Sequence, residues 1–213
     1  MTDAAFTQVF ARALQGHPCH VVEVDGYGEP RSLPVADWAR AADEADHLLL
    51  DRCEGATLDI GCGPGRLSAR LAELGHVVLG IDVVPEAVAQ AIGRGATALR
   101  RNVFESLPGE GRWRTALLAD GNIGIGGDPA ALLGRARELL DPRGRVVAEV
   151  APPGLGLRTT WAVLTCGDER SRPFRWSVVG ADAVPGLAAG VGLRQTGLHR
   201  AGDRWCVVLE EAP

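Results

Sequence analysis

The sequence predicts an α/β fold built on a seven-stranded, mostly parallel sheet, and three observations lead to this prediction. From residue 57 onward, short apolar runs alternate with amphipathic helical stretches, as expected for parallel strands joined by crossover helices. A glycine-rich turn, GCGPG at 61–65, follows the first of these runs directly. The chain closes on two strand-like runs around Ala201-Gly202-Asp203, which predicts an antiparallel terminal hairpin. With 213 residues, the chain is long enough to bury one sizeable core.

The first 54 residues do not follow this alternation and read as an N-terminal extension. The expected elements are a helix over 6–14, a hairpin of strands 20–24 and 32–35 that turns at Asp25-Gly26, and a helix over 37–53. No flexible linker follows, so we expect residues 1–54 to pack on the main domain, residues 55–213, and to cover the substrate site.

Each element of the main domain has its own signal. The expected parallel strands are 57–61, 76–81, 97–101, 115–119 and 145–150, and the helices between them are 64–74, 85–92 and 129–140. Pro85 and Pro129 suit first helical turns, and Asp128 suits an N-cap. After the fifth strand, a β-hairpin insertion is expected at about 157–179, with strands 157–166 and 174–179. A helix over 182–191 and the terminal hairpin, 193–200 with 204–210, complete the chain.

Composition excludes several classes of function. All 22 basic residues are arginine, so lysine Schiff-base chemistry and a GxxxxGK[ST] phosphate loop are excluded. A net charge of −5 argues against nonspecific nucleic-acid binding. No apolar run approaches the length of a membrane span and the first residues lack an export signal, so we expect a cytoplasmic protein without a membrane partner.

The five cysteines are odd in number and scattered, with no CxxC pair. This pattern supports neither a disulfide framework nor a zinc or other metal site. We therefore expect reduced, mostly buried thiols.

A nucleoside site is predicted where the first two parallel strands end. Glycines at 61, 63 and 65 let the backbone approach a ligand closely, ahead of a helix N-terminus. Asp82 ends the second strand, 21 residues after Gly61, where it can accept hydrogen bonds from both ribose hydroxyls. The spacing is GxGxG rather than the GxGxxG of dinucleotide sites, and Asp59 precedes the first glycine by two residues. Acids here would repel a pyrophosphate but tolerate a cationic sulfonium.

With these residues the chain resembles the class I S-adenosylmethionine (SAM)-dependent methyltransferases. The resemblance is carried by LDIGCGPG (58–65), GID (80–82), RNVF (101–104), LLADGN (117–122) and RVVAEV (145–150). It covers about 57–151 closely, and the terminal hairpin extends it to the end of the chain. The resemblance implies a Rossmann-like fold, SAM as cofactor and S-adenosylhomocysteine (SAH) as product.

The resemblance also implies a set of cofactor-binding residues. They are Asp59, Gly61, Cys62, Gly63, Gly65, Asp82, Val83, Asn102, Val103 and Asp120. Asp59 would order the loop and Asp82 would hold the ribose hydroxyls. Asn102 departs from the pattern, because family members often carry an acid there to accept from the adenine amino group. An amide oxygen can still accept, though more weakly, and the backbone N–H of Val103 could serve the ring.

Candidate catalytic residues are Asp120 and Asn122, at the end of the fourth strand beside the transferable methyl, and Glu149. Asp120 and Asn122 could instead only cap that loop. The (Asp/Asn)-Pro-Pro-aromatic motif of amide and adenine N-methyltransferases is absent, which disfavours base methylation of nucleic acids. The histidines of the extension, His17, His20 and His47, fit ordinary structural roles better than that of a general base.

The expected acceptor-binding residues are His20, Trp161 and Trp176, with the inserted hairpin as a lid of aromatic surface. The alternative is that these aromatics pack a small core of the insertion or a dimer contact. The predicted function is methyl transfer to oxygen or nitrogen of a small molecule, mainly by positioning and desolvation, by a monomer or homodimer. Alternatives are a SAM-fold enzyme for another reaction, such as cyclisation, and a non-catalytic SAM-binding subunit. A nicotinamide-dependent reductase is disfavoured by the loop spacing and by the absence of a Tyr-x-x-x-Lys pair.

Overall fold

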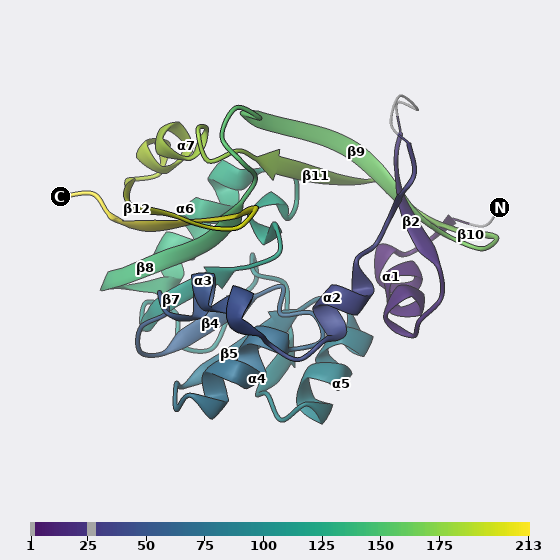
Figure 1. The fold of residues 1–213 in the computed structure, drawn as a ribbon, viewed down its shortest axis with the longest axis horizontal. Helices are drawn as coiled ribbons and strands as arrows, with labels where there is room; N and C mark the ends of the chain where they lie inside the picture. Colours follow the sequence, from purple (N-terminus) through teal and green to yellow (C-terminus); the bar gives the residue numbers. More distant parts are fainter. Residues whose placement is uncertain (1–2, 25–28) are drawn as a thin grey trace.

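A computed structural model describes residues 3–24 and 29–213, and its described part contains two sheets (Figure 1). The larger sheet has the order β12-β13-β8-β7-β4-β5-β6. Its strands are β4 (Thr57–Ile60), β5 (Val78–Asp82), β6 (Ala98–Arg100), β7 (Trp113–Leu118), β8 (Leu140–Val150), β12 (Leu193–Ala201) and β13 (Arg204–Glu211). The strands β4 to β8 pair in parallel, whereas β13 is antiparallel to both of its neighbours. The prediction of a seven-stranded, mostly parallel sheet with an antiparallel hairpin is confirmed.

Helices cover both faces of this sheet. They are α4 (Arg66–Glu73), α5 (Pro85–Gly93), α6 (Pro129–Leu139) and α7 (Val184–Gly190). Because strand residues alternate between faces, Leu118 of β7 packs with α6 and α7, while Leu117 packs with α4 on the opposite face. The predicted caps hold, since Asp128 accepts a hydrogen bond from the Ala131 N–H at 3.0 Å and Pro85 and Pro129 open their helices.

The second sheet combines strands of the N-terminal extension with strands of the insertion that follows β8. It has the order β1-β10-β9-β2-β3, with β11 also paired to β9. Its strands are β1 (Asp3–Ala4), β2 (Cys19–Glu23), β3 (Arg31–Ser32), β9 (Leu157–Cys166), β10 (Glu169–Ser171) and β11 (Phe174–Val179). In Figure 1 the long β9 and β11 strands run from the main sheet toward β2 and α1 (Phe6–Leu14). The extension and the insertion therefore form one structural layer.

Two sequence-based predictions are corrected in this layer. The helix expected over 37–53 is broken into α2 (Val35–Ala39), a 3₁₀ turn η1 (Glu44–Asp46) and α3 (His47–Leu50). Arg40 is extended, Asp43 caps η1 by accepting from the Ala45 N–H, and the Asp46 side chain is buried. Helical spacing of apolar residues continues across the break, which is why the pattern did not reveal it. In the first hairpin, the second strand ends at Ser32 and Val35 already belongs to α2, while Asp25-Gly26 lies outside the described residues.

The expectation that all cysteines are reduced is also corrected, because Cys19 and Cys166 form a disulfide. They lie directly opposite each other on β2 and β9, although 147 residues separate them in the chain. No local spacing signals such a pair. Cys53 and Cys206 are free and buried, and Cys62 is free and half-buried.

Within residues 3–24 and 29–213, no helix combines the length and apolar character needed to cross a membrane.

Candidate cofactor and acceptor site

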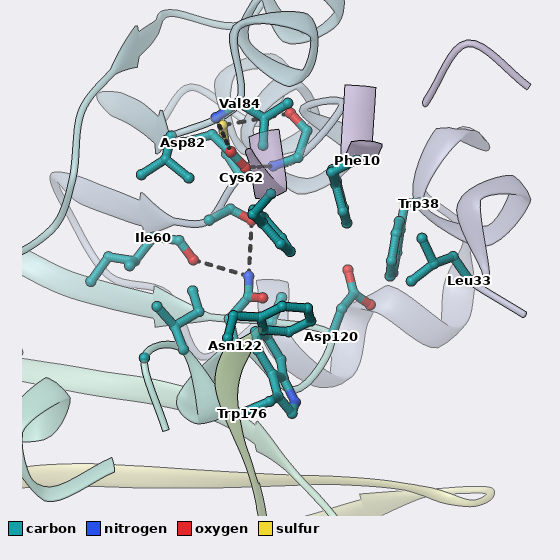
Figure 2. Close-up of a pocket in the computed structure, with 18 of the residues that line it drawn as sticks. Phe10, Leu33, Trp38, Ile60, Cys62, Asp82, Val84, Asp120, Asn122 and Trp176 are labelled. Atoms are coloured by element: carbon teal, nitrogen blue, oxygen red, sulfur yellow. Dashed lines mark hydrogen bonds between the residues drawn. The ribbon is translucent and has the colours of Figure 1, made fainter. Parts of the chain in front are cut away.

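A cavity of about 660 Å³ lies between the carboxyl ends of the main-sheet strands and the second sheet (Figure 2). One wall comes from the ends of β4, β5 and β7 and the loops that follow them. The opposite wall comes from α1, β2, β3, the segment 33–38, β9 and β11. We call the first wall the cofactor half and the second the acceptor half. Ligands of open parallel sheets generally bind at this edge, beyond the carboxyl ends of the strands.

The glycine loop after β4 is shaped by positive backbone angles. Gly61, Gly63 and Gly65 have φ of 73°, 53° and 82°. A Cβ on Gly61 would lie 2.7 Å from Nδ2 of Asn122, and one on Gly65 would lie 2.7 Å from Cα of Ala91. A Cβ on Gly63 would meet no atom within 4 Å, so this residue presents open backbone to the cavity. Gly65, by contrast, packs on α5 and is not among the lining residues.

Asp82 ties the loop to the end of β5. Its Oδ2 accepts a hydrogen bond from the Gly63 N–H at 3.0 Å, and its Oδ1 accepts from the Val84 N–H at 2.8 Å (Figure 2). Burial raises the pKa of Asp82, and these backbone hydrogen bonds oppose the rise. Each carboxylate oxygen has a second acceptor site, which leaves two directed acceptors for a ligand's vicinal hydroxyls. The neighbouring Val83 also lines the cavity.

Asp59 lies buried beneath the loop. The Ser68 hydroxyl donates to its Oδ2 at 2.6 Å, which links β4 to α4. Burial raises the pKa of Asp59 to about 6. Cys62 also lines the cavity, and burial raises the pKa of its thiol well above the ordinary value.

Asn102 and Val103 line the cavity after β6, where the sequence placed the adenine contact. Asn102 is exposed, and its Oδ1 accepts from the Phe104 N–H at 3.1 Å. Val103 is buried, and its carbonyl accepts from Nε of Arg135 at 3.0 Å.

Asp120, at the end of β7, has a φ of +51° and is the one non-glycine residue with positive φ among those the structure describes. Arg66 donates through Nη2 to both of its carboxylate oxygens at 2.7 Å. Burial raises the pKa of Asp120, and the charge of Arg66 opposes that rise. Backbone strain of this kind persists where the surroundings fix it and is common at functional sites. Figure 2 shows the Asp120 carboxylate facing the space beside Phe10 and Trp38.

An ion-pair network lies behind Asp120 and was not predicted from the sequence. The buried Asp46 carboxylate accepts from Arg66, from Arg204 at 2.8 Å and from Arg40 at 2.8 Å. Burial alone would raise the pKa of Asp46, but the three arginines hold it well below its usual range. The network connects the extension to the cofactor half. No local signal could have found it, because its members come from distant segments.

The other two catalytic candidates have structural partners. Nδ2 of Asn122 donates to the carbonyls of Ile60 at 3.0 Å and Gly61 at 2.9 Å, so this side chain fastens the glycine loop while lining the cavity (Figure 2). Glu149 is not a lining residue. Its carboxylate accepts from Arg204 at 2.7 and 2.9 Å and from the Asp120 N–H at 2.9 Å.

The acceptor half is mainly apolar and aromatic. Its large lining side chains are Phe6, Phe10, Trp38, Phe174 and Trp176. Of the three residues expected to bind the acceptor, only Trp176 lines the cavity. His20 and Trp161 are absent from the lining, and Trp161 is 54% exposed. Strand alternation explains this, because the neighbours Val21 on β2 and Thr160 and Ala162 on β9 face inward.

Comparison with known proteins shows which of them the central part of this chain is similar to. A family model described as a methyltransferase domain matches residues 57–144. An O-methyltransferase of ubiquinone biosynthesis from Cereibacter sphaeroides is 38% identical over 95 residues, which span 42% of this chain and 38% of that protein's length.

Solved structures share the fold over more of the chain. A SAM-dependent methyltransferase from Bacteroides fragilis, in complex with SAH, has a TM-score of 0.81 at 20% identity and covers 98% of this chain and 94% of its own. The 1,6-didemethyltoxoflavin-N1-methyltransferase of Burkholderia thailandensis has a TM-score of 0.63 at 20% identity, covering 100% of this chain and 93% of its own.

The family model spans the glycine loop and the ends of β4, β5 and β7, where the cofactor half lies. The fold likeness extends over nearly the whole chain. Residues 57–144 therefore match the methyltransferase-domain family, and nearly the whole chain has the fold of a solved SAM-dependent methyltransferase.

Proposed function

We propose that this chain binds SAM in the cofactor half and transfers its methyl group to an oxygen or nitrogen of a small molecule held in the acceptor half. The observation that carries the proposal is the shape of this cavity. In its cofactor half, the backbone of Gly63 is open to the cavity and the Asp82 carboxylate is held by a backbone hydrogen bond. Its acceptor half is lined by aromatic side chains.

The residues of the cofactor half fit SAM. Asp82 offers two oriented acceptors to the ribose hydroxyls, and Asn102 and Val103 lie where the adenine would be held. Asp120 and the loop carbonyls offer negative groups to the ammonium end of the methionine portion. When bound, SAM supplies a methyl group already activated by a sulfonium, so the protein's task is to position the acceptor and exclude water.

The acceptor half supports the methyl transfer by enclosure. The extension and the inserted hairpin form this wall together, because β2 pairs with β9. We propose that this layer, including Trp176 and Phe10, covers the acceptor and keeps water from the reacting atoms. Asp120 is the ionisable side chain that faces this space in Figure 2, and its bidentate contact with Arg66 suits a positioning role better than proton abstraction.

Thermal unfolding with SAH tests the cofactor part of the proposal. SAH at 100 times its dissociation constant should stabilise the protein by about 2.7 kcal/mol, a rise in midpoint of roughly 5–10 °C for a chain of this size. Asp82→Ala should abolish the rise, whereas Asp203→Asn, an exposed aspartate of the terminal hairpin, should keep it. NADH and NADPH serve as ligand controls. An equal midpoint with and without SAH in the unmodified protein would refute the proposal, and detection of SAH as a product would separate methyl transfer from other SAM chemistry.

A further inference from the structure

We propose that the acceptor is an aromatic molecule that carries an anionic group, and that Arg31 and Arg158 recognise this group. The inference rests on the proposed function and adds the substrate class to it. It comes from the distribution of charge along the walls of the cavity.

The charged lining residues divide unevenly between the two halves. The described residues that line the cavity include four acids and five arginines. Three of the acids, Asp59, Asp82 and Asp120, lie in the cofactor half. Three of the arginines, Arg31, Arg158 and Arg175, lie in the acceptor half, where Glu23 is the one acid among the described lining residues. The acceptor half therefore carries an excess of positive charge although the chain as a whole has a net charge of −5.

Glu23 orients the two arginines without using up their hydrogen-bonding capacity. Its side chain is only 9% exposed, and Nη2 of Arg158 donates to its Oε2 at 2.5 Å. Nη2 of Arg31 lies 3.7 Å from Oε1. Both arginine side chains are about two-thirds exposed, at 64% for Arg31 and 65% for Arg158. Among the residues that the structure describes, neither guanidinium makes a hydrogen bond to a second partner. Since a guanidinium has five N–H donors, this pair can donate further hydrogen bonds to a second anion.

The rest of the acceptor half specifies the body of the molecule. Phe10, Trp38 and Trp176 surround the space beside Asp120 (Figure 2). Apolar and aromatic walls with a few convergent polar groups favour a flat, mostly apolar ligand held in one orientation. A guanidinium binds a carboxylate or a phosphate through two parallel hydrogen bonds, so we expect the anionic group of the acceptor to be one of these two. Opposite charges at the two ends would also orient the acceptor with its anionic end away from the aspartates.

A matched set of probes tests this inference: 2-naphthoate, 2-naphthyl phosphate and the neutral 2-naphthamide. Binding is measured by isothermal titration calorimetry on the full chain, with and without saturating SAH. We expect at least one anionic probe to bind about tenfold or more tightly than the amide at 50 mM NaCl. That advantage should shrink at 500 mM NaCl because these arginines are exposed and salt screens them. The stronger of the two anions identifies the group as carboxylate or phosphate.

Variants assign the effect to these residues. Arg158→Gln and Arg31→Gln should each lower the affinity for the preferred anionic probe about fivefold and change the affinity for the amide by less than twofold. Arg158→Lys, which keeps the charge but loses the planar fork, should fall between. Glu23→Gln should increase the affinity for the anionic probe, because it removes the competing carboxylate. Trp176→Leu should weaken all three probes alike. Arg194→Gln, on the exposed face of β12, is the charge control and should change nothing.

Equal affinity of the charged and neutral probes, or a charge preference unaltered in both Arg158→Gln and Arg31→Gln, would overturn the inference. Should Arg158→Gln fold poorly, Arg31→Gln decides, since its longer contact with Glu23 makes it a milder change. Anion preference without SAH binding would retain the anion site and reject the proposed function. SAH binding without anion preference would retain the proposed function and reject the anion site.

Discussion

Two buried aspartates, Asp46 and Asp59, have pKa values that are shifted in opposite directions by their surroundings. Asp46 is surrounded by Arg40, Arg66 and Arg204, which hold its pKa well below the usual range despite burial. Asp59 has one hydroxyl donor, Ser68, and its burial raises its pKa to about 6. The two groups should therefore contribute to folding stability with opposite dependence on pH.

Asp46 stabilises the folded state above pH 3.8, its ordinary pKa, and loses this contribution as the pH falls toward its lower folded-state pKa. Asp46→Asn leaves buried arginine charge uncompensated and should lower the free energy of unfolding by about 3–5 kcal/mol at pH 7. At pH 3 the deficit should be smaller by about 1 kcal/mol, since the unfolded chain then holds the proton. Urea unfolding at both pH values measures this, with Asp203→Asn as the exposed control. A deficit that does not change with pH would contradict the explanation.

Asp59 behaves in the opposite way, because its folded-state pKa lies above its ordinary value of 3.8. Between pH 3.8 and 6 the folded state binds the proton more tightly, so the contribution of this group becomes less favourable as pH rises and stays so above pH 6. Asp59→Asn keeps an acceptor for Ser68 and removes the titration. Its free energy of unfolding relative to the unmodified protein should rise by about 2 kcal/mol from pH 4 to pH 7. Urea titrations at intermediate pH check this slope, and a flat difference would place the titration elsewhere.

At the scale of elements, the acceptor wall depends on one close contact between a loop and a strand. The turn η2 (Asn122–Gly124) and the residues after it lie against β11, with a bridge between Ile125 and Trp176. A Cβ on Gly124 would lie 1.9 Å from the Ser177 carbonyl oxygen. The glycine-rich run at 123–127 makes a close-packed turn against the inserted hairpin.

Gly124→Ala should therefore push β11 away from the loop and lower stability by about 1–3 kcal/mol. Gly186→Ala is the matched control, because Gly186 lies in α7 and a Cβ there would meet no atom within 4 Å. This control should raise stability by about 0.5–1 kcal/mol through helix propensity alone. Midpoints of urea unfolding for the two variants should move in opposite directions. Equal shifts would mean that the 124–177 contact does not limit packing.

At the scale of the whole molecule, the extension and the insertion are held together by pairing and by one covalent link. The Cys19–Cys166 disulfide closes a loop of most of the chain between β2 and β9. Buried residues of α1 and β9, Val9 and Leu164 among them, pack around this link.

Reduction should lower the stability of the protein by about 2–5 kcal/mol, since the link restricts the unfolded chain. The thermal midpoint of the unmodified protein should fall by about 5–15 °C with reductant. The double variant Cys19→Ala/Cys166→Ala should start at the lower midpoint and show no response to reductant, because Cys53, Cys62 and Cys206 are free. A midpoint that is unaffected by reductant in the unmodified protein would count against a stabilising link.

The main sheet and the location of the cofactor half could be predicted from the sequence alone. The strands β4, β5 and β7 are each followed by a helix, and the glycine loop and Asp82 lie at the ends of the adjacent strands β4 and β5. These signals are local, because parallel strand–helix units fix their own direction and bring strand ends to one edge. The terminal hairpin was equally readable from its two apolar runs and short turn.

The residues that face the acceptor half became known only from the three-dimensional structure. Whether Trp176 or Trp161 faces the cavity depends on the register of β9 and β11, and a slip of one residue would exchange the faces. The Asp46 network and the Cys19–Cys166 link join segments that are far apart in the chain. Such contacts follow from how β2 pairs with β9 and how the extension packs on β13, which no local pattern encodes.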